Sequence, residues 1–270
     1  MSVKFSNEKI SEHIIRIRDG SDVCEYLVIG TDRAMLIDTG YGIGDLKGYI
    51  RTLTDLPLTV YITHGHVDHA SGTAAFDDVH MSHYDLELLQ KHCNLKFRKE
   101  MLKNSGLDLL ERDYMPDRKA LFINIKDQET IGLGGVHVVM IHVPGHTKGT
   151  FVPLIKEDNI IVFGDASGVG TLICLEGSTT IREYLRSLKY LKTYENQYNM
   201  ILRQHGTCTS SLSLLNENIE NCELILSHKD DHIPTEFMGN TCFWARERDE
   251  HGNRLDGKEG NICYQEDNIE

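Results

Sequence analysis

The sequence lacks long hydrophobic runs, an excess of basic residues and any abundance of proline. Its 270 residues include five prolines, and 28 Lys and Arg residues stand against 41 Asp and Glu residues, which gives a net charge of −13. No window approaches the roughly 20 apolar residues that a membrane-spanning helix requires. An acidic chain without a basic patch is poorly suited to nucleic acid as its main partner. We therefore expect neither a membrane nor a nucleic-acid partner.

The seven cysteines form no recognisable pairing pattern. Their number is odd and no CxxC pair occurs, so neither a disulfide framework nor a four-cysteine zinc knuckle is expected. Residues 1–6 contain neither an apolar run nor a small-residue cleavage site, so we expect no signal peptide. Both observations favour a cytoplasmic location.

The length allows one large domain or two small ones, at roughly 100–200 residues per domain. No internal repeat, low-complexity tract or Pro-rich linker divides the chain. We predict a single domain over residues 1–270, with a helical insertion at about residues 82–120 and a C-terminal extension at about residues 207–270.

Short β-type runs occur in two groups, at about residues 10–60 and 120–205, and each group alternates with helical patterns. One such pattern covers Thr180–Tyr194, where apolar residues recur at helical spacing. Two groups of this kind predict an α/β fold with two sheets packed together and helices outside, an αββα sandwich. The tail after Ile233 predicts a hairpin that packs on this domain.

Four candidate metal ligands follow directly after the apolar run Leu58–Ile62. They are His64, His66, Asp68 and His69. In an extended segment, residues two apart point the same way, so His64 and His66 can project into one site. Asp68 and His69 can then face a second point nearby. Imidazole and carboxylate groups suit zinc, and four candidates at this spacing disfavour the alternative of a surface run of histidines.

Three later residues occupy similar positions. His146 follows an apolar run on a Pro-Gly turn, and Asp165 and His205 each follow an apolar run. A loop at the end of a buried strand is where a rigid scaffold presents functional groups. Together with the first four residues, these three supply the number of ligands that two metal ions require.

This set resembles the motifs of the metallo-β-lactamase superfamily, from Ile37–Gly40 through the HxHxDH motif to His205. The resemblance favours the glyoxalase II-like and lactonase-like branch. It implies an αββα fold and two divalent metal ions, zinc above all, although iron and manganese suit the same ligands. In the implied arrangement His64, His66 and His146 hold one ion, Asp68, His69 and His205 hold the other, Asp165 bridges both, and Asp38 supports the ligands from behind.

Some features separate the sequence from other branches of that superfamily. Diiron electron-transfer members carry Glu at the position of His66. Many true β-lactamases are secreted and carry Cys at the position of Asp165. Nuclease members usually carry extra domains, for which a chain of 270 residues leaves little room.

The resemblance implies a metal-dependent hydrolase in which a metal-bridged hydroxide attacks the carbonyl of a small ester, lactone or thioester. Asp68 is the candidate catalytic residue, which would orient the hydroxide and pass a proton to the leaving group. A phosphodiesterase, a β-lactam-type amide hydrolase and a non-catalytic metal-binding module are the alternatives. The expected partner is a small-molecule substrate, and a homodimer is left open. Phe97, Met101, Leu107 and Tyr114 could line either a pocket or the core.

Overall fold

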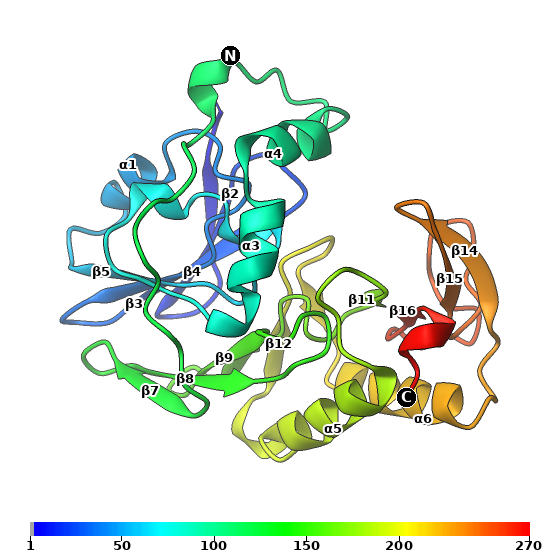
Figure 1. Cartoon of the computed structure of the whole chain (residues 1–270). Coiled ribbons are helices and arrows are strands. Elements are labelled where there is room, and N and C mark those ends of the chain that lie inside the picture. Colours follow the sequence, from blue (N-terminus) through cyan, green and yellow to red (C-terminus); the bar gives the residue numbers. More distant parts are fainter. Residues whose placement is uncertain (1–2) are drawn as a thin grey trace.

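The computed structural model describes residues 3–270, which form three β-sheets and six α-helices (Figure 1). In spatial order, the first sheet comprises β1 (Ser6–Lys9), β2 (Ile14–Arg18), β3 (Cys24–Ile29), β4 (Ala34–Ile37), β5 (Leu58–Tyr61) and β6 (Val79–His80). The second comprises β13 (Thr209–Ser210), β12 (Met200–Leu202), β10 (Ile160–Val162), β9 (Phe151–Ile155), β8 (His137–His142) and β7 (Glu129–Gly132). The third comprises β11 (Thr171–Ile173), β16 (Ile262–Tyr264), β15 (Asn240–Trp244) and β14 (Ile233–Phe237).

The first two sheets pack face to face and enclose the central core. Tyr26 and Met35 of the first sheet belong to one buried cluster with Met140 and Val162 of the second. Burial of such apolar side chains is the main favourable contribution to folding. This packing confirms the two inner β-layers of the predicted sandwich.

Helices cover the outer faces of both sheets, as Figure 1 shows. The helices of the described residues are α1 (Leu46–Arg51), α2 (Val67–Ala70), α3 (Leu86–His92), α4 (Leu95–Leu102), α5 (Ile181–Lys192) and α6 (Leu214–Leu226), of which α2 lies at the edge of the sandwich and carries Asp68 and His69. Leu46 and Ile50 of α1 pack in a cluster with the outer face of the first sheet. Leu188 of α5 and Ile219 of α6 pack in a cluster with the second. The predicted αββα fold is therefore confirmed. No helix among residues 3–270 has both the length and the apolar character needed to cross a membrane.

Helix α5 shows how local sequence sets these boundaries. The hydroxyl of Thr180 accepts a hydrogen bond from the backbone N–H of Glu183, and the Glu183 carboxylate accepts one from the backbone N–H of Thr180. This reciprocal cap satisfies two backbone donors at the start of the helix. Buried Ile181, Leu188 and Leu191 recur at helical spacing and attach the helix to the core.

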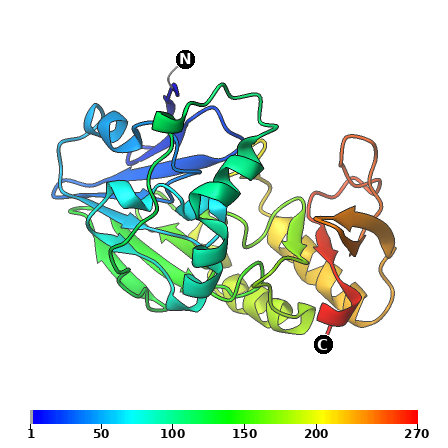
Figure 2. The same cartoon turned by 45° about the horizontal axis from the view of Figure 1, so that its top comes forward.

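The C-terminal tail forms most of the third sheet. β15 and β16 pair antiparallel, which confirms the predicted hairpin, and β14 adds a further antiparallel strand. β16 also pairs in parallel with β11, which precedes it by about 90 residues, so the tail is joined to the sandwich by strand pairing. Figure 2 shows this sheet at one end of the molecule, beside the yellow-orange helix α6. The sequence did not predict the pairing with β11, because a three-residue strand is too short to show a clear period.

The loop between β4 and α1 packs directly on α2. The backbone N–H of Thr39 donates to the carbonyl of His69 at 2.8 Å, and that of Ser71 donates to the carbonyl of Gly40 at 3.1 Å. Gly42 has a φ of +67°, and a Cβ atom there would lie 2.5 Å from the Ser71 carbonyl oxygen. The segment that follows Asp38 therefore requires glycine at this contact.

We expect Gly42→Ala to lower the free energy of unfolding by about 3–5 kcal/mol, because the new methyl group meets backbone that cannot move aside. Gly257→Ala is the matched control, since Gly257 has a φ of +76° but a Cβ there meets nothing within 4 Å. It should cost only the strain of the left-handed conformation, about 1–2 kcal/mol. Urea unfolding of both variants measures the difference, and equal losses would contradict close packing at Gly42.

Candidate metal centre

The predicted ligands lie at one edge of the sandwich, where strands of both sheets end. His64 and His66 follow β5, His146 follows β8, Asp165 follows β10 and His205 follows β12. β8 and β10 are both antiparallel to β9, and β12 is parallel to β10, so β8, β10 and β12 run in the same direction. Their carboxyl ends therefore meet at the same edge, next to the end of β5.

Three buried imidazoles, those of His64, His66 and His146, form the first cluster, with candidate ligand atoms within 4.8 Å of one another. Burial first, and then the neighbouring imidazoles, hold the pKa of His64 and of His66 well below its ordinary value, so both rings are neutral. Their buried Nε2 atoms have no hydrogen-bond partner within the described part of the chain. An unsatisfied buried polar atom costs about 1–3 kcal/mol, and a bound cation would satisfy His64 Nε2. The His66 ring faces the cluster through Nδ1, which lies 2.9 Å from His146 Nε2. The cluster thus fits a metal that accepts imidazole, such as zinc.

Hydrogen bonds around the first cluster set the tautomers of two of its rings. The Thr63 hydroxyl donates to Asp38 at 2.7 Å, so His64 Nδ1, which lies 3.0 Å from the same hydroxyl oxygen, must be the donor to it. His146 Nδ1 lies 2.8 Å from the carbonyl oxygen of Leu172 and donates to it. Both rings therefore keep an Nε2 lone pair, which is the form that binds a metal.

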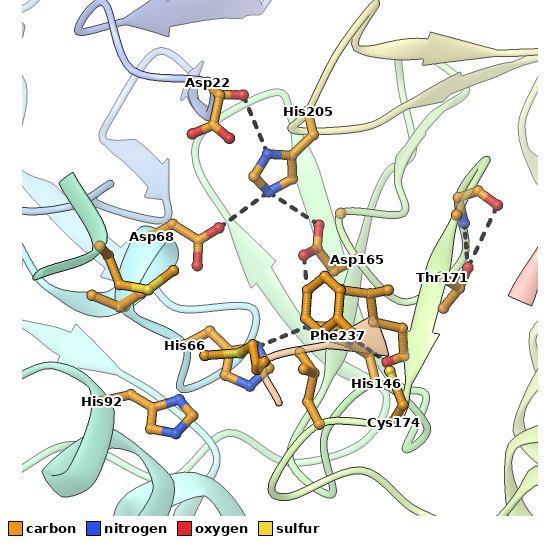
Figure 3. A pocket seen from close by; sticks show the side chains of 18 of the residues that line it. Asp22, His66, Asp68, His92, His146, Asp165, Thr171, Cys174, His205 and Phe237 are labelled. Atoms are coloured by element: carbon orange, nitrogen blue, oxygen red, sulfur yellow. Dashed lines mark hydrogen bonds and ion pairs between the residues drawn. The ribbon is translucent and has the colours of Figure 1, made fainter. Parts of the chain in front are cut away.

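The second cluster combines two carboxylates with two imidazoles, and Figure 3 shows three of these residues, Asp68, Asp165 and His205, facing one another. His205 Nε2 lies 3.2 Å from Asp68 Oδ2 and 3.6 Å from Asp165 Oδ1. Asp165 Oδ2 lies 3.6 Å from His69 Nε2 and 3.5 Å from His146 Nε2. Asp165 therefore faces both clusters, which is the place that a bridging ligand requires.

Opposite charges dominate the second cluster. Burial alone would lower the pKa of His205, but the charges of Asp165 and Asp68 raise it to about 9. The pKa of His69 is also raised well above its ordinary value, because Asp68 and Asp165 outweigh the effect of burial. Burial would raise the pKa of Asp68, yet the charge of His69 and the hydrogen bond from His205 lower it. The negative charges of Asp68 and Asp165 thus keep protons on the imidazoles of His69 and His205. A divalent cation bound between these groups can replace those protons.

Asp38 lies behind both clusters and bonds to residues beside them. Its carboxylate accepts hydrogen bonds from the backbone N–H and the hydroxyl of Thr63, each at 2.7 Å. It also accepts from His69 Nδ1 at 2.8 Å and from Gln204 Nε2 at 2.7 Å. The bond to His69 leaves Nε2 of that ring facing Asp68 and Asp165. The contributions of Thr63 and Gln204 had no signal in the sequence beyond their positions next to predicted ligands.

Asp85 is a further buried carboxylate that the sequence did not identify. It accepts hydrogen bonds from the backbone N–H groups of Gly65 and Gly149, at 2.9 and 2.8 Å, and from the hydroxyl of Thr147 at 2.6 Å. These bonds connect the loop that carries His64 and His66 to the loop that carries His146. An Asp within a polar, helix-rich stretch gives no local sign of such a role.

The two clusters form part of the wall of a cavity of about 740 Å³. Apolar side chains line much of the remainder: Phe97, Met101, Val169, Leu172, Leu175, Phe237, Met238 and Trp244. Phe97 and Met101 thus line a pocket, and Phe97, Leu107 and Tyr114 also pack against a small core cluster that contains Val23 and Tyr41. His92, which the sequence did not single out, also faces the cavity (Figure 3) and stacks on His66 with ring centroids 5.3 Å apart.

A family model described as the metallo-beta-lactamase superfamily matches residues 25–205. The chain belongs to the metallo-beta-lactamase superfamily. The match confirms the resemblance drawn from the motifs, and it includes every candidate ligand from His64 to His205. The strands β14, β15 and β16 lie beyond the matched residues, although β14 and β15 contribute Phe237 and Trp244 to the cavity.

Curated relatives include enzymes that act on acyl derivatives. The acyl-coenzyme A thioesterase MBLAC2 of Homo sapiens is 26% identical over 183 residues, which cover 62% of this chain and 66% of the relative. The match thus spans just under two thirds of that protein. The hydroxyacylglutathione hydrolase GloC of Haemophilus influenzae is 26% identical over 157 residues, which cover 54% of this chain and 68% of the relative.

Solved structures with the same fold include a metallo-beta-lactamase from Pontibacter korlensis. It has a TM-score of 0.61 and 18% identity, and the match covers 82% of this chain and 99% of that one. The sec-alkylsulfatase Pisa1 from Pseudomonas sp. has a TM-score of 0.64 and 11% identity, with 84% of this chain and 42% of that one covered. At these identities the likeness establishes the fold alone.

We expect Asp38→Asn to weaken metal binding about 10–100-fold, because the amide loses the charge and the acceptor that orient His69 and Thr63. Zinc affinity measured in competition with a chromophoric chelator reports the change.

Asp78→Asn is the matched control, since Asp78 also accepts from a threonine and a histidine, at 2.9 Å from Thr59 and 3.1 Å from His80. Asp78 lies away from both clusters, so its variant should bind zinc as the unaltered chain does. Unchanged zinc affinity in Asp38→Asn would contradict the supporting role of Asp38.

Proposed function

We propose that this chain is a metal-dependent hydrolase that cleaves small acyl compounds, with thioesters favoured over esters and lactones. The single observation that carries the proposal is the composition of the cavity, in which the two metal-binding clusters and an apolar surface share one space. Such a space can hold an apolar acyl group beside the reacting carbonyl. The named activities of the thioesterase and the hydroxyacylglutathione hydrolase relatives support the choice of thioesters.

We assign the metal ligands in two groups. His64, His66 and His146 would hold one divalent ion, Asp68, His69 and His205 the other, and Asp165 both, with zinc as the preferred metal and iron or manganese as alternatives. Two ions held in this way would supply a nucleophilic hydroxide at neutral pH and a Lewis acid for the carbonyl oxygen.

The chain's own residues would perform the other tasks of the reaction. The Asp68 side chain is 17% exposed at the cavity, and its Oδ2 atom already interacts with His205 Nε2. A carboxylate in this position can orient the attacking oxygen and transfer its proton to the departing thiolate sulfur. Phe97, Phe237 and Trp244 would bind the acyl chain and exclude water from it.

Hydrolysis of a panel of thioesters, esters, lactones, β-lactams and phosphodiesters by the zinc-loaded chain tests the proposal. We expect the highest kcat/KM for thioesters, a rise with the length of an apolar acyl chain, and loss of activity after chelation. Asp68→Asn should lower kcat by about 10²–10⁴-fold, the range of a proton-transfer contribution.

The control for this variant is its zinc content, measured in the same preparation, because Asp68 is also an assigned ligand. Full activity of Asp68→Asn with unchanged zinc content would eliminate the proton-transfer role. A preference for phosphodiesters or β-lactams would eliminate the acyl-thioester assignment, and metal binding without any turnover would favour a non-catalytic module.

The cytoplasmic location and the single-domain organisation over residues 1–270 stay predictions. The same holds for the helical insertion at about residues 82–120, which contains α3 and α4, and for the extension at about residues 207–270. A small-molecule substrate is the partner that the cavity supports, and homodimer formation stays an open prediction.

A further inference from the structure

Three buried thiols meet on the third sheet, apart from the histidine and aspartate clusters. Cys174 directly follows β11, Cys242 lies in β15 and Cys263 lies in β16. Their sulfur atoms all lie within 4.8 Å of one another, and the sulfur atoms of Cys174 and Cys263 are 3.7 Å apart. All three residues are at most 5% exposed. None of them belongs to the candidate ligand set of the metal centre.

The strand register brings these thiols to one face of the sheet. Cys263 pairs with Leu172 of β11 on one side and with Trp244 of β15 on the other. Side chains two residues apart in a strand point to the same face, so Cys174 shares the face of Leu172, and Cys242 shares that of Trp244. β15, β16 and the residue that follows β11 thus each present one thiol to the same point. Hydrogen-bonded backbone, and not a mobile loop, holds Cys242 and Cys263 in place.

The 3.7 Å between the sulfur atoms of Cys174 and Cys263 fits a single coordination sphere, and the sulfur of Cys242 lies within 4.8 Å of both. Metal–thiolate bonds of about 2.3 Å require sulfur atoms about 3.7–4 Å apart in tetrahedral or trigonal geometry. By contrast, Cys93 and Cys222 are buried thiols that belong to no such cluster in residues 3–270, and they are ordinary core residues. The convergence of three thiols, more than their burial, distinguishes this cluster from the core cysteines.

The surroundings favour a soft ion that is satisfied by three ligands. The thiols pack among Leu172, Leu175, Phe237 and Trp244, and the described residues contribute no fourth His, Cys, Asp or Glu donor to the group. Soft thiolates select Cu(I) and zinc, but structural zinc almost always has four ligands. Arg248, whose guanidinium lies 3.4 Å from the centroid of the Trp244 ring, places a positive charge beside this face of the sheet.

We propose that Cys174, Cys242 and Cys263 form a three-thiolate site for one Cu(I) ion. Binding forms three sulfur–copper bonds and releases the three thiol protons to solvent, without any change in oxidation state. The two ligand sets share no residue, although Cys174 also lines the cavity of the proposed hydrolase site.

The position of this thiolate site also gives it a structural consequence. Leu172, whose carbonyl oxygen accepts the hydrogen bond from His146 Nδ1, lies in β11 two residues before Cys174. An ion held by Cys174, Cys242 and Cys263 would therefore fasten the C-terminal strands β15 and β16 to the strand that supports His146. Because the ion binds only the folded chain, it should stabilise that chain.

Anaerobic titration of the zinc-loaded chain with Cu(I) tests the site, with thiolate-to-copper charge-transfer absorption in the ultraviolet as the readout. We expect the band to saturate at one equivalent of Cu(I) and the thermal unfolding midpoint to rise. Cys263→Ser and Cys242→Ser should each abolish the band, while Cys222→Ser, a matched buried cysteine outside the cluster, should retain it. The zinc content of each variant verifies that the remainder of the chain is folded.

Cys174→Ser provides a second test if the strand variants do not fold, since Cys174 lies just beyond β11. Absence of the band in the unaltered chain, or its persistence in a folded Cys174, Cys242 or Cys263 variant, would overturn the proposal. A parallel titration with Cd(II) tests the choice of metal. A charge-transfer band that depends on the three cysteines and appears with Cd(II) but not with Cu(I) would overturn the assignment of a three-coordinate Cu(I) ion.

Discussion

One buried carboxylate, that of Asp38, connects the chain segments that form the candidate metal centre. It lies directly after β4, accepts two hydrogen bonds from Thr63 after β5, and accepts one each from His69 in α2 and from Gln204 after β12. These donors come from both large sheets and from the short helix between β5 and β6. A shift of any one segment would therefore leave a buried charge without part of its hydrogen bonding, which is costly in an apolar interior.

The two clusters in front of Asp38 differ in electrostatic character. His64 and His66 are kept neutral by burial, whereas Asp68 and Asp165 hold protons on the imidazoles beside them. The first cluster thus offers lone pairs without charge, and the second offers negative charge that a cation can neutralise. Asp165 faces both, so its carboxylate can couple two ions in one site.

Local sequence patterns predicted those features that depend on nearby residues. The spacing of His64, His66, Asp68 and His69 suffices to predict four candidate ligands, because all four lie within six residues after a buried strand. Likewise, the alternation of strand and helix patterns predicted the αββα layers, which the packing of both large sheets confirms.

Features that arise from contacts between distant segments could not be predicted in this way. Asp85 bonds to Thr147 across 62 positions, and neither residue shows a local signal for that contact. Cys174 meets Cys263 across 89 positions through the pairing of two three-residue strands, which are too short for a hydrophobic period to identify. The apolar side of the cavity likewise depends on where the third sheet lies, so Phe237 and Trp244 could not be assigned to it in advance.

The most direct test of the central claim, that seven side chains hold two divalent ions, is anomalous X-ray scattering at the zinc edge from crystals of the zinc-loaded chain. The account predicts two strong peaks with Asp165 between them. One should lie among His64, His66 and His146, and the other among Asp68, His69 and His205. A single peak, or a second peak held by other side chains, would contradict it.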